Sequence, residues 1–298
     1  MNKKSDCFLF FVKMTFFVLL LFPPFSFFSQ ESVIIYQKGT PLYEDVANGL
    51  SSKVTVKTSI PVEKDKEEDA LIQLMPQKDS LVCAIGPKSV TSAFQSQCSN
   101  MVAVGIPNPL SKIYSQSKGV SFVSMYPDVK AILDYFSKTN SAKSFGIIYT
   151  NSVNQEMGDY FKREIESSGF KCKVLGVDKA QDLVSPFPFF LGQVDVAFLL
   201  IDPLAYNNDA VKFMVTKAIE KKKIICAFSE QIPSNGIPMA LFVPASALVD
   251  ITAKALKEAK PGTSFPPYFS TSFSISINEQ AMKAIGALYD DKKVKTKY

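Results

Sequence analysis

Short, continuous apolar runs recur along this chain, and most of them are followed by a segment long enough for one helix. Continuous rather than alternating runs are typical of strands that are buried on both faces of a parallel sheet. The runs cover residues 32–36, 54–59, 80–85, 101–105, 143–149, 172–177, 194–201 and 223–228. Helices are expected at 43–50, 89–97, 127–139, 154–168, 210–222 and 245–259. This repeated order predicts an α/β protein with open, mainly parallel sheets and helices on both faces.

The strand-then-helix series occurs twice, once from residue 32 to about 124 and again from residue 143. Two sheets of about 100–120 residues each fit the usual size of a domain better than one large sheet. After a proline-rich loop at 260–267, residues 270–277 alternate like an antiparallel or edge strand, and 279–288 predict a last helix. The sequence therefore predicts two lobes.

The first residues have the pattern of an export signal. Lys3 and Lys4 precede an apolar stretch at 14–28, and Ser29 is a small residue at a plausible cleavage point. We expect residues 1–29 to be a signal peptide and the protein to be exported, to the periplasm. An uncleaved membrane anchor is the alternative. Cys7 precedes the apolar stretch, which argues against a lipid anchor.

The composition excludes several classes of function. The chain has no histidine, which removes the nucleophile systems and zinc sites that need an imidazole. None of the common catalytic or nucleotide-binding glycine motifs is present. The formal charge of +5 is spread rather than concentrated on one basic segment, so nucleic acid is not an expected partner. We expect no catalytic residues, no cofactor and no metal, and the cysteine spacing specifies no disulfide.

Polar turns follow the expected strands, and ligands of open α/β sheets bind beyond the carboxyl ends of strands. Each turn taken alone is a turn or a helix N-cap. Together they place polar groups at the same edge of both sheets, which is what a cleft between lobes requires. The turns lie at residues 37–43, 86–89, 105–109, 149–152, 201–204 and 228–231.

Several stretches, in order and spacing, resemble one known family. They are VIIYQKGTPLYEDVANG (33–49), AIGPKS (84–89), VGIPNP (104–109), FGIIYTN (145–151), VDVAFLLID (194–202), AFSE (227–230) and FSISINEQAM (273–282). In these stretches the chain resembles the substrate-binding proteins of ABC transporters whose better-known members bind aromatic amino acids such as tryptophan. The chain departs from the family pattern at 49–54 and 108–119, which are short.

The resemblance implies a fold like that of type I periplasmic-binding proteins, in which two Rossmann-like lobes are joined by crossing segments. The expected lobes are 30–124 with about 240–265, and 125–239 with about 266–290, followed by a solvated basic tail at 291–298. The resemblance implies two partners, a small solute such as an amino acid and an ABC permease in the membrane. We expect a monomer.

The candidate site residues surround the expected cleft. Backbone N–H groups and hydroxyls near Gly86, Lys88 and Ser89 would hold a carboxylate. Asp202 is the candidate partner of an ammonium group, with Ser229 or Glu230 as alternatives. Tyr36, Tyr43 or Tyr149 would cover an apolar part of the solute. The full set is Thr40, Tyr43, Gly86, Lys88, Ser89, Asn108, Tyr149, Asn151, Asp202, Ser229 and Glu230.

Two other functions stay open at this point. The first is an exported interaction or sensor module without a transport role, in which the polar turns only cap helices. The second is a hydrolase that uses Asp202 and Glu230 as paired carboxylates, since two facing acids are the machinery of many glycosidases. The sequence favours the binding protein over both.

Overall fold

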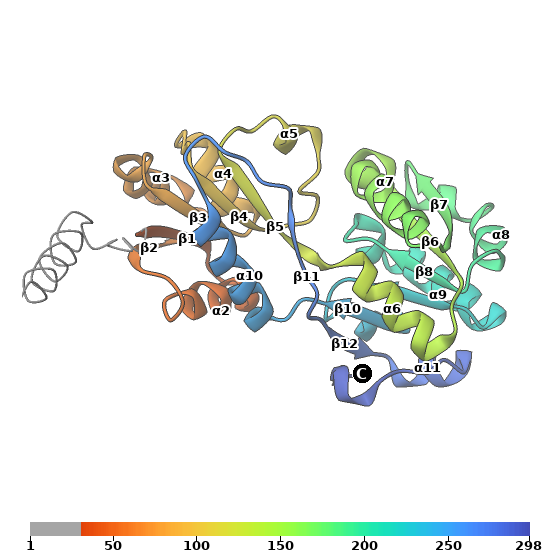
Figure 1. Ribbon diagram of the computed structural model, residues 1–298. Coiled ribbons are helices and arrows are strands. Elements are labelled where there is room, and N and C mark those ends of the chain that lie inside the picture. Colours follow the sequence, from red (N-terminus) through yellow and green to blue (C-terminus); the bar gives the residue numbers. More distant parts are fainter. Residues whose placement is uncertain (1–30) are drawn as a thin grey trace, which may run out of the picture. The chain divides into compact units, whose positions relative to one another are not determined.

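A computed structural model describes residues 31–298 (Figure 1). The expected signal peptide at 1–29 lies outside these residues. The described part folds around two sheets, which we call lobe A and lobe B together with the helices that cover them. Two mainly parallel sheets in an α/β chain are what the sequence predicts.

Lobe A contains a six-stranded sheet of order β11-β5-β4-β3-β1-β2, in which all pairs are parallel. Its strands are β1 (Ser32–Gln37), β2 (Val56–Val62), β3 (Leu81–Ile85), β4 (Met101–Ile106), β5 (Val120–Pro127) and β11 (Tyr268–Ser270). Side chains alternate between the two faces. Ile34 packs with α2 (Pro41–Leu50) and α10 (Ala245–Glu258), whereas Val33 and Ile35 pack with α3 (Glu67–Leu74) and α4 (Pro87–Gln95). Helices therefore cover both faces.

Lobe B contains a seven-stranded sheet of order β13-β12-β10-β9-β8-β6-β7. Its strands are β6 (Ser144–Thr150), β7 (Lys171–Val177), β8 (Val196–Leu199), β9 (Ile224–Ala227), β10 (Met239–Phe242), β12 (Ser274–Ile277) and β13 (Val294–Lys297). β12 runs antiparallel to β10, and the other pairs are parallel. One face packs against α6 (Val129–Asn140), α7 (Asn151–Ser167) and α11 (Glu279–Ile285), and the other against α8 (Phe187–Gly192) and α9 (Asn208–Lys221).

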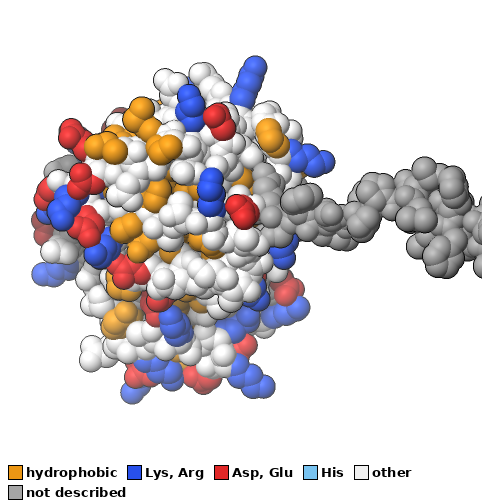
Figure 2. Space-filling model, turned by 90° about the vertical axis from the view of Figure 1, so that its left-hand side faces the viewer, with side chains coloured by type: hydrophobic (Ala, Val, Ile, Leu, Met, Phe, Trp, Pro, Cys, Tyr) orange, Lys and Arg blue, Asp and Glu red, His pale blue; other side chains and the backbone are white. Residues whose placement is uncertain are grey.

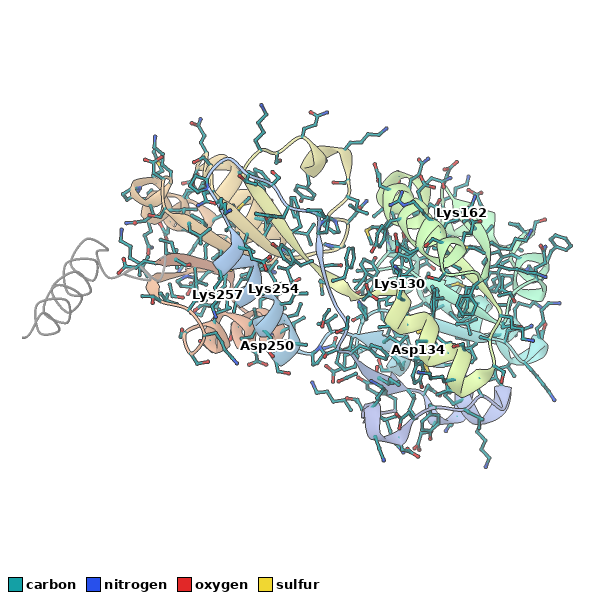
Figure 3. All side chains as sticks on the ribbon, in the orientation of Figure 1. Lys130, Asp134, Lys162, Asp250, Lys254 and Lys257 are labelled. Carbon is teal, nitrogen blue, oxygen red and sulfur yellow. The ribbon has the colours of Figure 1, made fainter. Side chains whose placement is uncertain are left out.

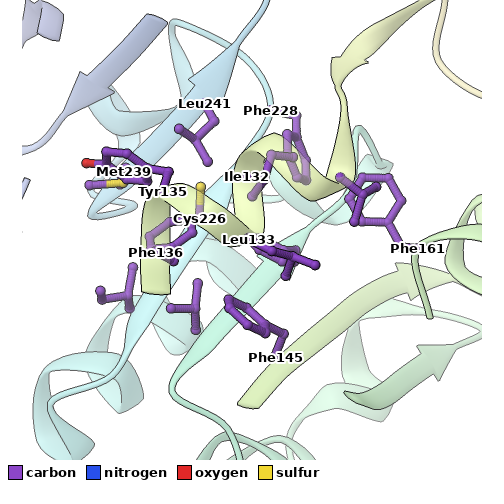
Figure 4. Packing of buried hydrophobic residues seen from close by; sticks show 14 of the residues in the cluster. Ile132, Leu133, Tyr135, Phe136, Phe145, Phe161, Cys226, Phe228, Met239 and Leu241 are labelled. Atoms are coloured by element: carbon purple, nitrogen blue, oxygen red, sulfur yellow. The ribbon is translucent and has the colours of Figure 1, made fainter. Parts of the chain in front are cut away.

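Aromatic side chains fill the core under α6 and α7 (Figure 4). Phe145 stacks on Phe198 with ring centroids 5.6 Å apart, and Phe161 meets Phe228 edge to face at 5.5 Å. Offset and edge-to-face rings add to the stabilisation from burial. The carboxyl end of β9, where Phe228 lies, is therefore held firmly in place.

Short elements complete the described chain. They are α5 (Lys112–Ser115) and the 3₁₀-helices η1 (Met75–Gln77), η2 (Ala180–Leu183), η3 (Pro203–Tyr206), η4 (Ile232–Asn235) and η5 (Asp291–Lys293). Among the described residues, no helix has both the length and the apolar composition that crossing a bilayer demands.

The chain passes between the two lobes three times: from β5 to α6, from β10 to α10, and from β11 to β12. Two of the crossings bond to each other, because the N–H of Asp128 donates to the carbonyl of Ser270 at 2.8 Å. Asp128 also caps α6 through a hydrogen bond from the N–H of Ala131. The lobe boundaries expected from the sequence, near residues 124, 240 and 266, remain a prediction.

Two expectations for the last 30 residues differ from the structure. The sequence predicts one antiparallel or edge strand over 270–277. Residues 274–277 do form an antiparallel strand, β12 of lobe B, but Ser270 belongs to β11 of lobe A. Hydrogen bonds between Ser270 and Ser272 turn the chain there. Residues 291–298 form η5 and β13 rather than a solvated tail. The pairing is possible because Val294 and Thr296 face inward while Lys295 and Lys297 face solvent.

Charged side chains lie on the outer faces of the helices. Asp250, Lys254 and Lys257 project from α10, and Lys130 and Asp134 project from α6 (Figure 3). Figure 2 shows one face of the molecule, on which basic and acidic side chains are interspersed. Exposed ion pairs, such as that between Asp134 and Lys138, contribute little to stability.

Candidate functional site

A cavity of about 460 Å³ lies where the two lobes meet. Lobe A contributes the start of α2, Met125 of β5 and the start of α10. Lobe B contributes Tyr206 of η3, the turn after β9, Phe242 of β10 and Lys295 of β13. This volume matches the 300–1,000 Å³ usual for sites that take small molecules. The lining residues are Thr40, Pro41, Leu42, Tyr43, Asp45, Met125, Tyr206, Phe228, Ser229, Glu230, Gln231, Phe242, Val243, Pro244, Ala245, Leu248 and Lys295.

Tyr43 forms the lobe A wall and is fixed from several sides. Pro41 occupies the first turn of α2, and the N–H groups of Tyr43 and Glu44 donate to the carbonyl of Thr40 at 2.9 and 3.2 Å. The Tyr43 hydroxyl donates to the carbonyl of Gly105 at 3.4 Å. Burial, and secondarily the nearby Tyr206, raises the pKa of Tyr43. Tyr43 therefore presents a neutral aromatic ring to the cavity.

Glycines make room for that ring. At Gly86 the backbone has φ +91°, and a Cβ there would lie 2.9 Å from the Tyr43 ring. At Gly105 the value is φ +80°, and a Cβ would lie 2.7 Å from the same ring. L side chains rarely adopt such φ values, and the contact distances leave no space for a methyl group. The two glycines thus serve to seat Tyr43.

Glu230 is the acidic group of the lobe B wall. Its Oε1 accepts a hydrogen bond from the Thr296 hydroxyl at 2.9 Å, and its Oε2 lies 3.4 Å from the ammonium of Lys295. Its backbone carbonyl accepts a 2.6 Å hydrogen bond from the Ser276 hydroxyl. The Lys295 ammonium also lies 5.5 Å from the centre of the Phe242 ring. Glu230 is thus held by neighbouring strands of the same sheet.

The cavity combines apolar rings with opposite charges. Tyr43, Tyr206, Phe228 and Phe242 supply the rings, while Asp45 and Glu230 are acids and Lys295 is a base. An ionised carboxylate has about four lone-pair positions, so Glu230 keeps acceptor capacity for a ligand. The aromatic rings can also attract a cationic group of a ligand through cation–π interactions. In the described residues no cluster of His, Cys, Asp or Glu has the arrangement of a metal site.

Of the residues predicted from sequence, Thr40, Tyr43, Ser229 and Glu230 line this cavity. The other seven lie elsewhere. Gly86 supports the Tyr43 ring without lining the cavity, and its N–H donates to the carbonyl of Val104 at 2.8 Å. The Lys88 ammonium forms an ion pair with Glu67. Ser89 is fully buried, and its hydroxyl has no hydrogen-bond partner among the described residues.

Asp202 is buried, and the hydrogen bonds that its carboxylate accepts from the described residues stay within lobe B. Its Oδ2 accepts from the N–H of Thr150 at 2.7 Å and from Asn154 Nδ2 at 2.9 Å. Its Oδ1 accepts from the Thr150 hydroxyl at 2.7 Å and from the N–H of Leu204 at 3.0 Å. These four bonds satisfy the carboxylate without a solute. The geometry therefore favours a structural role for Asp202.

The remaining three residues contact α7 or its surroundings. Asn108 donates through Nδ2 to the carbonyl of Val153 at 2.8 Å and to Glu156 at 3.2 Å, which links lobe A to lobe B. Tyr149 is buried against Gly158 and Gly176. Asn151 donates to Asp178 at 2.9 Å. None of the three lines the cavity, and Tyr36 does not either.

Sequence reasoning missed several lining residues. Met125 and residues 243–245 lie in crossing segments, whose position depends on how the two sheets are joined. Tyr206 follows the turn at Asp202 and had a usable signal, an aromatic residue near the carboxyl end of a strand. Lys295 falls in the stretch that the sequence predicts to be a solvated basic tail. Its alternation with Val294 and Thr296 was the signal for a strand.

Comparison with known proteins shows the fold. No family model and no curated protein matches the sequence. A substrate-binding protein with adhesive properties from Clostridium difficile, solved in a ligand-free, open form, is 17% identical with a TM-score of 0.65; the match covers 90% of this chain and 98% of that one. A conserved domain protein from Vibrio cholerae is 15% identical, with 91% and 100% covered and a TM-score of 0.54.

A third solved structure is an ABC domain from Streptococcus pneumonia in complex with L-Trp. It is 18% identical, with 90% of this chain and 100% of that one covered and a TM-score of 0.50. At these identities the likeness concerns the fold. The chain has the two-lobed α/β fold of ABC solute-binding proteins, the type I periplasmic-binding-protein architecture.

Proposed function

We propose that this protein is an exported solute-binding protein that takes a small solute into the interlobe cavity and delivers it to an ABC importer. The observation that carries the proposal is the cavity itself, which is lined by Tyr43 from lobe A and by Ser229 and Glu230 from lobe B. A solute that contacts both lobes binds a closed form better than an open one. It therefore shifts the population toward closure, which a membrane permease reads.

The charges and rings of the cavity support a solute with an ammonium group and an apolar part, such as an amino acid. The ammonium pairs with Glu230, and the apolar part lies against Tyr43 and Phe228. The complex of the Streptococcus pneumonia domain with L-Trp is consistent with this class. We propose a monomer in the periplasm, with a membrane anchor at 1–29 as the alternative to a cleaved signal.

Hydrolysis by paired carboxylates has less support. It would need Asp202 and Glu230 to act on the same substrate, but Asp202 is 2% exposed and does not line the cavity that Glu230 lines. One similar structure is a substrate-binding protein, and another is an ABC domain in complex with L-Trp. We therefore propose binding without turnover.

Thermal unfolding of the purified protein with a panel of amino acids, peptides, nucleosides and sugars tests this proposal. A ligand that binds only the native state raises its stability by about 2.7 kcal/mol at a hundredfold excess over its Kd. We expect one chemical class, the amino acids, to raise the melting temperature. A panel in which no compound changes the melting temperature contradicts the proposal and favours an interaction module.

A further inference from the structure

Strand β13 contributes to the cavity, although its sequence is that of a basic surface segment. It pairs with β12 in parallel, with Val294 opposite Ile275 and Thr296 opposite Ser276. Beyond it, the N–H of Tyr298 donates to the carbonyl of Ile277 at 2.9 Å. The strand is therefore a bonded part of the lobe B sheet.

Both carboxylate oxygens of Glu230 are contacted by this one strand. Thr296 donates to Oε1 at 2.9 Å, and Lys295 lies 3.4 Å from Oε2. The side chains of Glu230 and Lys295 are 33% and 54% exposed, so both remain accessible from the cavity they line. A second contact from Tyr298, whose hydroxyl donates to the Glu230 carbonyl at 3.3 Å, fixes the turn after β9.

The two exposed lysines of this strand contact different acids. Lys295 lines the cavity, whereas Lys297 pairs with Glu279 at 3.5 Å and Asp291 at 3.2 Å and is absent from the cavity lining. Glu230 and Lys295 side by side give the cavity a negative and a positive group in contact. A zwitterion offers the complementary pair, with its ammonium toward Glu230 and its carboxylate toward Lys295.

We infer that β13 is part of the solute site: Lys295 binds the anionic end of the solute, and Thr296 is a positioning residue that aims the Glu230 carboxylate at the cationic end. The inference rests on the proposed function. It adds that β13 determines which charged groups of the solute the cavity accepts. Without the Thr296 hydroxyl, Glu230 loses the hydrogen bond that orients Oε1. Without Lys295, the cavity loses the basic group described in its wall.

Calorimetric titration with three matched probes tests the inference. L-tryptophan carries both charges, tryptamine only the ammonium and indole-3-propionate only the carboxylate. We expect Thr296→Val to weaken the binding of L-tryptophan and of tryptamine about tenfold, which is the scale of one hydrogen bond to a charged group. The affinity for indole-3-propionate should stay unchanged. Lys295→Met should instead weaken the binding of L-tryptophan and of indole-3-propionate. Lys297→Met is the matched control and should bind all three as the wild type does.

Thr296→Ser restores the hydroxyl and should restore wild-type affinity. Melting temperatures without ligand show whether each variant is folded. Equal weakening of all three probes, or wild-type binding by both Thr296→Val and Lys295→Met, overturns the inference while leaving the proposed function intact. Failure of the wild type to bind any of the three probes removes the zwitterion as the solute and overturns the inference with it.

Discussion

The carboxylate of Asp202 accepts hydrogen bonds from both the backbone N–H and the hydroxyl of Thr150, each at 2.7 Å. Thr150 ends β6, and Asp202 precedes η3, so the pair joins two strand ends of lobe B. With Asn154 and Leu204 as further donors, this carboxylate fixes the segment that carries Tyr206 to the cavity.

Replacement of Asp202 by alanine should therefore lower stability rather than change solute preference. It leaves the buried donors of Thr150 and Asn154 without their acceptor, and losing a buried, charged hydrogen-bond partner costs about 3 kcal/mol. Urea unfolding measures this loss. A variant with wild-type stability that no longer binds solute would instead give Asp202 a direct role in binding.

Replacement of Gly86 by alanine should displace Tyr43 and weaken solute binding at least tenfold. The new Cβ would lie 2.9 Å from the Tyr43 ring, so the ring must move from its place in the cavity wall. Gly169→Ala is the matched control, because Gly169 has φ +84° but no atom within 4 Å of the added Cβ. Both variants should lose about 1 kcal/mol of folding stability, because alanine disfavours a positive φ. Only Gly86→Ala should lose affinity for the solute. Equal affinities would mean that Tyr43 does not contact the solute.

Stability should fall in acid partly because of Asp195. Burial raises the pKa of this carboxyl, but hydrogen bonds from Lys143 and Ser144, with the charge of Lys223, outweigh burial and hold the pKa below its usual value. A lowered pKa in the folded state adds stability above the unfolded-state pKa, and this contribution is lost as the pH falls through the folded-state pKa.

Asp195→Asn tests that contribution through urea midpoints between about pH 7 and pH 2. We expect the variant to be less stable than the wild type at neutral pH, with a difference that shrinks toward the acid end. Asp134→Asn, which alters an exposed pair with Lys138, is the control and should change stability little. A constant difference between Asp195→Asn and the wild type across the range would contradict the assignment.

The sequence predicted the two-lobed fold because buried parallel strands leave a local signal, continuous apolar residues such as 81–85. It did not separate β11 from β12, because the crossing between lobes at Ser270 and Ser272 depends on the partners that each half finds in space. Edge strand β13 was missed because its lysines hide the alternation of Val294 and Thr296.

The polar turns after the expected strands also left a local signal in the sequence, and they suggested part of the candidate site. Of the residues that the turns after strands suggested, Thr40, Tyr43, Ser229 and Glu230 line the cavity. Sequence does not distinguish a carboxylate that faces a cavity from one that bonds to its own lobe, and Asp202 does the latter. Crossing residues such as Met125 are set by the arrangement of the two sheets.

Solute binding in the interlobe cavity is tested most directly by a single fluorescent reporter. The chain contains no tryptophan, so a Gln231→Trp variant carries one indole, placed at an exposed lining position of the cavity. Gln193→Trp places the reporter away from the cavity lining as a control. We predict that a solute without an indole ring that raises the melting temperature also changes the emission of the Gln231→Trp variant saturably, and leaves that of Gln193→Trp unchanged. A stabilising solute that leaves the emission of the Gln231→Trp variant unchanged would contradict binding in this cavity.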